Sequence, residues 1–122
     1  MRMWGQTKVL IVDDEPDICF LFGRILLKRD VKAGYANNLA EAIQSVQADP
    51  PSLIFLDNSL PDGEGVDLIP FLKQHFPQTR VVMVTANDTA MDKKKAFQQG
   101  ADDFLGKPLS LALINRTLDE IK

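Results

Sequence analysis

Five short apolar stretches recur along the chain, separated by longer amphipathic stretches. Within them, apolar and polar residues do not alternate as they would in strands with one solvent-facing side, and the strongest stretches are rich in Val, Ile and Leu. This pattern is typical of strands covered on both faces of a sheet. The second stretch is the least apolar, which favours a position nearer the sheet edge. We predict strands at residues 8–12, 31–36, 53–56, 80–84 and 103–105.

The intervening stretches have the periodicity of helices. In the first, which begins at Pro16, apolar residues recur every three or four positions until Asp30 interrupts the pattern. Helices are predicted from 16 to 29, from 38 to 47, from 65 to 75, from 88 to 99 and from 110 onward, and Pro70 should lie in the first turns of its helix or kink it. The start and stop signals are a capping box at Asn38 and Glu41, caps at Asp88 and Ser110, and a helix end at Gly100.

Regular alternation of strand and helix predicts parallel strands joined by right-handed crossovers. The expected fold class is therefore α/β, a three-layer sandwich whose middle layer is a five-stranded parallel sheet. The segment Leu60-Pro61-Asp62-Gly63 predicts a turn. Residues 8–122 are interpreted as one domain, and residues 1–7 as an N-terminal tail of native or cloning origin.

Composition and charge exclude several classes of protein. The chain has 122 residues, 45% hydrophobic and 25% charged, which is typical of a globular domain. A single cysteine excludes an internal disulfide and favours a cytoplasmic location. The longest dense apolar stretch, Ile18 to Leu27, is too short to span a membrane, and residues 1–7 lack the apolar core of a signal peptide, so export is not expected. The net charge of −3 lacks the basic excess of a nucleic-acid-binding protein.

Chemically reactive side chains collect where the predicted strands end. Asp13 and Asp14 follow the first strand, Asp57 ends the third, Thr85 ends the fourth and Lys107 follows the fifth. Ligands of open parallel sheets bind outside the carboxyl ends of the strands. We therefore expect these five side chains to share one site.

Three carboxylates in one cleft repel one another, by roughly 3 kcal/mol per pair at about 5 Å and an effective dielectric of about 20. Either Lys107 or a divalent cation can compensate, and a set of oxygen ligands favours Mg²⁺ or a similar hard ion. A carboxylate nucleophile beside a metal and a fixed cation suits formation of an aspartyl phosphate. Asp57 is the best nucleophile because it ends the central strand alone, whereas Asp13 and Asp14 are paired and suit metal binding.

Each residue also has a purely structural interpretation. An Asp-Asp pair after a strand is often a turn or a helix cap, a threonine at a strand end often reflects β propensity, and a lysine before proline is often a solvated loop residue. Taken together, these structural interpretations are less convincing, because all five residues would have to meet at one sheet edge by coincidence. Cys19 and His75 are expected to have no chemical role.

The chain resembles the receiver domains of two-component response regulators. The similarity covers Lys8 to Ile121 and is carried by VLIVDDEPD, LIFLDNSLPDGEG, VVMVTAND and GADDFLGKP. It implies a flavodoxin-like fold with strand order 2-1-3-4-5, a phosphoacceptor at Asp57, and a phosphoryl donor that is a sensor histidine kinase or a histidine phosphotransfer protein. It also implies no enzymatic activity beyond the domain's own phosphorylation and dephosphorylation, and a monomer or a phosphorylation-dependent dimer.

The resemblance also assigns roles to individual residues. Asp13, Asp14, Asp57 and the backbone carbonyl of Ser59 would bind Mg²⁺, and Thr85 and Lys107 would contact the phosphoryl group. Thr85 and Phe104 would form the switch, Ser59 and Asn87 would tune phosphoryl lifetime, and the Lys107–Pro108 peptide bond would be cis. Phe104 lacks a tyrosine hydroxyl, so a switch there must act by packing. The alternative is a degenerate receiver that binds partners without phosphorylation.

The first predicted helix has apolar residues outside its core face, namely Phe20, Leu26 and Leu27. One interpretation is that they are partly buried against a neighbouring helix. The other is that they form a docking surface for the helical bundle of a partner. Two other families are less consistent with the motifs. A haloacid-dehalogenase-like phosphatase would need two aspartates separated by one residue after the first strand, whereas Asp13 and Asp14 are adjacent. A flavodoxin would bind a phosphate at this position, and the acidic pair would repel it.

Overall fold

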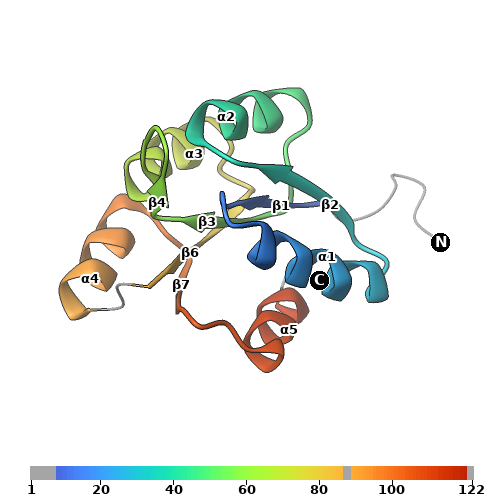
Figure 1. Ribbon diagram of the computed structural model, residues 1–122. Coiled ribbons are helices and arrows are strands. Elements are labelled where there is room, and N and C mark those ends of the chain that lie inside the picture. The colour runs from blue at the N-terminus through green and yellow to red at the C-terminus, as the bar shows by residue number, and fades with distance from the viewer. Residues whose placement is uncertain (1–7, 87–88, 121–122) are drawn as a thin grey trace.

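A five-stranded parallel sheet forms the middle layer of the molecule, in a computed structural model that describes residues 8–86 and 89–120 (Figure 1). Its spatial order is β2-β1-β3-β6-β7. Two short strands, β4 and β5, lie outside this sheet. When the five sheet strands alone are numbered along the chain, their order is the predicted flavodoxin-like 2-1-3-4-5. The strands are β1 (Lys8–Val12), β2 (Lys32–Ala36), β3 (Leu53–Asp57), β6 (Arg80–Thr85) and β7 (Asp103–Gly106).

Helices cover both faces of this sheet and complete the predicted three layers (Figure 1). One face carries α1 (Pro16–Lys28) and α5 (Leu111–Asp119), and the other carries α2 (Leu39–Ala48), α3 (Ile69–His75) and α4 (Ala90–Gln99). Within the described ranges, no helix has the length and apolar character needed to cross a membrane.

Successive residues of each central strand enter opposite cores, as the two-residue period of a strand requires. In β3, Leu53 and Phe55 pack toward α1 and α5, while Ile54 and Leu56 pack toward the other three helices. All four are buried, which explains why this strand shows no polar alternation. The expectation that Leu26 lies outside the core face of α1 is wrong, because its side chain is completely buried in the core shared with α5.

Most of the predicted helix ends are confirmed. The Asn38 side chain accepts a hydrogen bond from the Glu41 N–H at 2.8 Å, and Ser110 Oγ accepts one from the Leu113 N–H at 3.1 Å. Gly100 ends α4 with a φ of 114°, a conformation that glycine adopts without steric cost. The predicted cap at Asp88 is wrong. Thr89 caps α4 instead, and Asp88 lies outside the described residues.

The segment after β3 is more irregular than predicted. The predicted turn closes a small hairpin of β4 (Ser59–Leu60) and β5 (Gly63–Glu64), and the helix predicted from 65 to 75 is divided into a 3₁₀ turn, η1 (Gly65–Leu68), and α3. Pro70 lies in the first turn of α3, where its missing N–H costs no helical hydrogen bond. The Asp62 carboxylate accepts hydrogen bonds from the Leu39 and Ala40 N–H groups at 2.8 and 3.1 Å, and so ties the hairpin to α2.

Candidate functional site

The carboxyl ends of four sheet strands bring the predicted site residues to one edge of the sheet. Asp13 directly follows β1, Asp57 is the last residue of β3, Thr85 is the last residue of β6, and Lys107 directly follows β7. The strand register aligns these ends, since Asp57 lies opposite Val84 and Thr85 lies next to Lys107 through a backbone hydrogen bond of 2.8 Å. Residues up to 94 positions apart therefore meet through the parallel topology alone.

Three carboxylates lie close together at this edge. Asp13, Asp14 and Asp57 each offer an oxygen atom, and these atoms all lie within 4.8 Å of one another. Asp13 and Asp57 are buried, with 2% and 5% of their surface exposed, whereas Asp14 is exposed. The cluster therefore has two fixed carboxylates at the base and one at the mouth.

Lys107 is the cation of this cluster. Its Nζ lies 3.3 Å from Asp13 Oδ2 and 3.5 Å from Asp57 Oδ1, and 2.7 Å from Glu15 Oε1. The Lys107 side chain is only 14% exposed. One partly buried positive charge thus faces several carboxylates, so the cluster keeps a negative excess.

The buried carboxyl groups of this cluster are weaker acids than free aspartate side chains. Burial, and next the charge of Asp13, raise the pKa of Asp57 to about 6, while Lys107 and a hydrogen bond from the Ser59 N–H act in the opposite direction. Burial also raises the pKa of Asp13. Burial alone would lower the pKa of Lys107, but hydrogen bonding to Glu15 and the charges of Asp13 and Asp57 more than offset it, so its pKa is raised. Lys107 is therefore a permanent cation at neutral pH.

The backbone around Asp57 is held by two residues that sequence analysis did not single out. The Asn58 side chain accepts a hydrogen bond from the Val66 N–H at 3.0 Å, and its carbonyl accepts one from the Gly65 N–H at 2.9 Å. Gly65 packs so tightly that a Cβ atom there would collide with the carbonyl oxygen of Asp57. The Glu-Gly sequence after the turn was the available signal for this close approach, but one glycine in a loop does not indicate what approaches it.

A small hollow of about 170 Å³ lies beside the acidic cluster and is bounded by both predicted switch residues. Thr85 is buried, and Phe104 is half-buried with Lys93 Nζ 5.9 Å above its ring. Ser59 lies on β4 and is exposed, and Asn87, the other predicted tuning residue, lies outside the described residues. The Lys107–Pro108 peptide bond is cis, as the resemblance implied.

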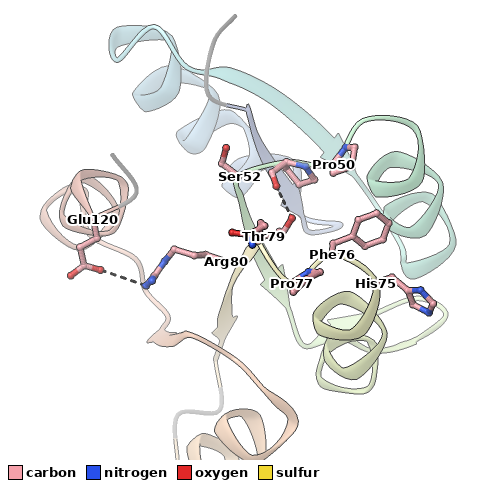
Figure 2. A pocket seen from close by; sticks show the side chains of 10 residues that line it. Pro50, Ser52, His75, Phe76, Pro77, Thr79, Arg80 and Glu120 are labelled. Carbon is pink, nitrogen blue, oxygen red and sulfur yellow. Dashed lines mark hydrogen bonds and ion pairs between the residues drawn. The ribbon is translucent and has the colours of Figure 1, made fainter. Parts of the chain in front are cut away.

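Another hollow, of about 650 Å³, lies at the opposite ends of β3 and β6 (Figure 2). His75 and the prolines 50, 51 and 77 line it, and its charged pair is Arg80 with Glu120, whose side chains come within 4.0 Å. The described residues that line it include no cluster of carboxylates. His75 therefore lies at the far end of the sheet from the acidic cluster.

Comparison with known proteins identifies the family. A family model described as the response regulator receiver domain matches residues 9–119. The chain belongs to the response regulator receiver domain family. The predicted resemblance and the predicted fold are therefore both confirmed.

Individual relatives place this receiver domain among two-component regulators. It is 41% identical over 107 residues to the response regulator protein PilR of Pseudomonas aeruginosa, covering 88% of this chain and 24% of PilR. It is 32% identical over 114 residues to the alkaline phosphatase synthesis regulatory protein PhoP of Bacillus subtilis, covering 93% of this chain and 48% of PhoP. The chain thus spans between about a quarter and half of the length of these relatives.

Solved structures are similar over nearly the whole receiver domain. A two-component response regulator from Clostridium difficile superposes with a TM-score of 0.91 at 30% identity, covering 95% of both chains. A response regulator from Burkholderia pseudomallei, solved with a phosphorylated aspartic acid, a calcium ion and citrate, has a TM-score of 0.85 at 27% identity, covering 92% of this chain and 66% of that one.

Proposed function

We propose that this receiver domain, residues 8–122, takes a phosphoryl group onto Asp57 from a histidine kinase or a histidine phosphotransfer protein and changes its surface in response. The observation that carries the proposal is the meeting of three carboxylates and one partly buried lysine at a single sheet edge. The Burkholderia relative with its phosphorylated aspartic acid and calcium ion supports the same chemistry. The location would be the cytoplasm, where such donors act.

Asp57 would act as the nucleophile. In the transfer, an Asp57 carboxylate oxygen forms a bond to phosphorus while the bond from phosphorus to the donor's imidazole nitrogen breaks, leaving the electron pair on that nitrogen. Lys107, 3.5 Å from Asp57 Oδ1, is placed to stabilise negative charge on the transferred oxygens, and the Thr85 hydroxyl would donate a hydrogen bond to them. The domain is itself the acceptor and is modified in the transfer, so it would not be an enzyme in the usual sense.

The donor set at the acidic cluster fits a hard divalent cation. Carboxylate oxygens from Asp13, Asp14 and Asp57 within 4.8 Å of one another, without nitrogen or sulfur ligands among them, match the preference of Mg²⁺. Asp13, Asp14, Asp57 and the Ser59 carbonyl would hold the ion. When bound, it would offset the negative charge that gathers around the phosphoryl group.

The response to phosphorylation would involve Thr85 and Phe104. Both line the hollow of about 170 Å³ beside the acidic cluster, so a movement of Thr85 toward the phosphoryl group would open space that the Phe104 ring can fill. This would alter the face made by α4, β7 and α5. Phosphoryl lifetime would depend on Ser59 and Asn87, neither of which offers an acid to orient water.

The partner that delivers the phosphoryl group would dock on α1. Phe20 and Leu27 are 67% and 81% exposed, which supports the docking interpretation over burial against a neighbouring helix. They lie on the helix that begins next to the acidic cluster, so a bundle seated there would bring its histidine toward Asp57. Replacing Phe20 with Ala should slow transfer from the kinase and leave phosphorylation by small donors unchanged.

The proposal is tested by intact mass after incubation with acetyl phosphate, with and without Mg²⁺, with an Asp57→Asn control. We expect a gain of one phosphoryl group that requires Mg²⁺ and is absent from the control. No gain in a folded sample that binds Mg²⁺ would mean that only a protein donor is used. No gain and no Mg²⁺ binding would favour the alternative, a degenerate receiver that binds partners without phosphorylation.

A further inference from the structure

The shortest contact of Lys107 is with a residue that has no assigned role. Its Nζ lies 2.7 Å from Glu15 Oε1 and donates a hydrogen bond to it, whereas Asp57 Oδ1 is 3.5 Å away. Lys107 also donates a hydrogen bond to Asp13 at 3.3 Å. The ammonium group is thus held most closely by a carboxylate at the rim of the site.

The Glu15 side chain does not cap the start of α1. Glu15 occupies the N-cap position of α1, but its side chain makes no capping hydrogen bond there. The Glu15 backbone N–H instead donates to Asp13 Oδ1 at 2.9 Å, which fixes the start of α1 against the acidic cluster. The Glu15 carboxylate, 58% exposed, is therefore directed at Lys107 without contributing to the cap.

We propose that Glu15 is a positioning residue that holds Lys107 at the rim of the site and so restrains phosphorylation of Asp57. This inference rests on the proposed function. Phosphoryl transfer from an acyl phosphate forms a bond between an Asp57 oxygen and phosphorus and breaks the bond between phosphorus and the acyl oxygen, which leaves as a carboxylate. The transferred oxygens then require the cation that Glu15 holds, so the Glu15 contact weakens as the product forms.

The test uses variants that differ in charge and in reach. Glu15→Gln removes the charge and keeps the length, whereas Glu15→Asp keeps the charge and shortens the side chain, so that it reaches Lys107 less well. At saturating Mg²⁺, both should be phosphorylated by acetyl phosphate about two- to fivefold faster than the unaltered domain, the change expected from loss of an ion pair with one exposed partner. Their affinity for beryllofluoride, a phosphoryl analogue, should rise by the same factor.

Two controls separate this role from a general effect of charge. Asp17→Asn removes a negative charge from the same first turn of α1, and Asp17 is not among the carboxylates that contact Lys107. It should leave both measurements unchanged. In a Lys107→Ala background, Glu15→Gln should have no effect, because the residue through which it acts is gone.

Several results would overturn the inference. One is a Glu15→Gln variant that is phosphorylated by acetyl phosphate no faster than the unaltered domain. Another is an Asp17→Asn variant whose phosphorylation is accelerated equally. A third is an acceleration by Glu15→Gln that persists in the Lys107→Ala background. If the unaltered domain takes up no phosphoryl group from any donor, the proposed function fails and this inference with it. If that domain is phosphorylated and Glu15→Gln is not faster, only the role of Glu15 fails.

Discussion

Replacing Asp57 with Asn should make the domain more stable near neutral pH in the absence of Mg²⁺. The Asp57 carboxyl group is buried beside Asp13, and burial first, then the Asp13 charge, raise its pKa to about 6 from a model-peptide value of 3.8. Ionising it in the folded protein is therefore harder than in the unfolded chain. An asparagine of the same shape avoids that cost.

The size of the effect follows from the pKa difference. At about 1.4 kcal/mol per pKa unit, a rise from 3.8 to about 6 corresponds to at most about 3 kcal/mol at pH 7. The acidic cluster opens to solvent at Asp14, and solvent screening lowers the expected gain below this limit, to about 1.5–2.5 kcal/mol. For a domain of this size, this raises Tm by about 4 °C per kcal/mol.

The gain should depend on pH in a defined direction. Because the folded state binds the Asp57 proton more tightly than the unfolded state, the stability of the unaltered protein increases as pH falls from about 6 to 3.8. The advantage of Asp57→Asn is therefore complete above pH 6 and disappears below 3.8. Saturating Mg²⁺ should also reduce it, because the ion neutralises the same charges.

Urea unfolding followed by far-UV circular dichroism, in EDTA at several pH values from 4 to 8, measures this effect. Asp62→Asn is the matched control of opposite sign. Hydrogen bonds from Leu39 and Ala40 lower the pKa of Asp62, so its charge stabilises the fold above pH 3.8, and Asp62→Asn should lower stability at pH 7. An Asp57→Asn protein no more stable than the unaltered one at pH 7, or a gain that does not change with pH, would refute the reasoning.

Four further substitutions test core packing and helix capping, each measured by the urea unfolding midpoint. Gly65→Ala should destabilise the domain by more than about 1 kcal/mol, because the added methyl group collides with the Asp57 carbonyl. Leu26→Ala should cost about 2–5 kcal/mol, whereas exposed Leu27→Ala should change stability by less than about 0.5 kcal/mol. Asn38→Ala should cost about 0.5–2 kcal/mol through loss of the α2 cap.

The strand order and the meeting of the acidic residues could be predicted because they follow from local signals and one topological rule. Asp13, Asp57 and Lys107 each end or follow an apolar run, and parallel strands bring those ends to one edge. The hairpin after β3 could not be predicted in the same way. Asp62 in this hairpin accepts hydrogen bonds from the start of α2, a contact between residues more than 20 positions apart.

Contacts between residues that are distant in the sequence also explain the wrong prediction for Leu26 and the absence of a predicted role for Glu15. Helical periodicity identifies one apolar face, but α1 packs against both the sheet and α5, which widens the buried stripe to include Leu26. Glu15 lies within a recognised motif, yet its partner Lys107 is 92 residues away. Sequence spacing predicts which elements form, whereas pairings of individual side chains require the packed structure.

The acidic cluster links the stability of this receiver domain to its chemistry. The buried carboxylates that destabilise the fold are the groups that would attract a cation and attack phosphorus, so weakening the repulsion would weaken the reaction. The surrounding core offsets the cost, because β1 and β3 are buried between two layers of helices up to the residues that precede the carboxylates. A cation that binds only the folded state would increase the free energy of unfolding with the logarithm of its concentration once above its Kd, by about 2.7 kcal/mol at a hundred times the Kd. The free domain would therefore be least stable in the state that is ready to bind its cation.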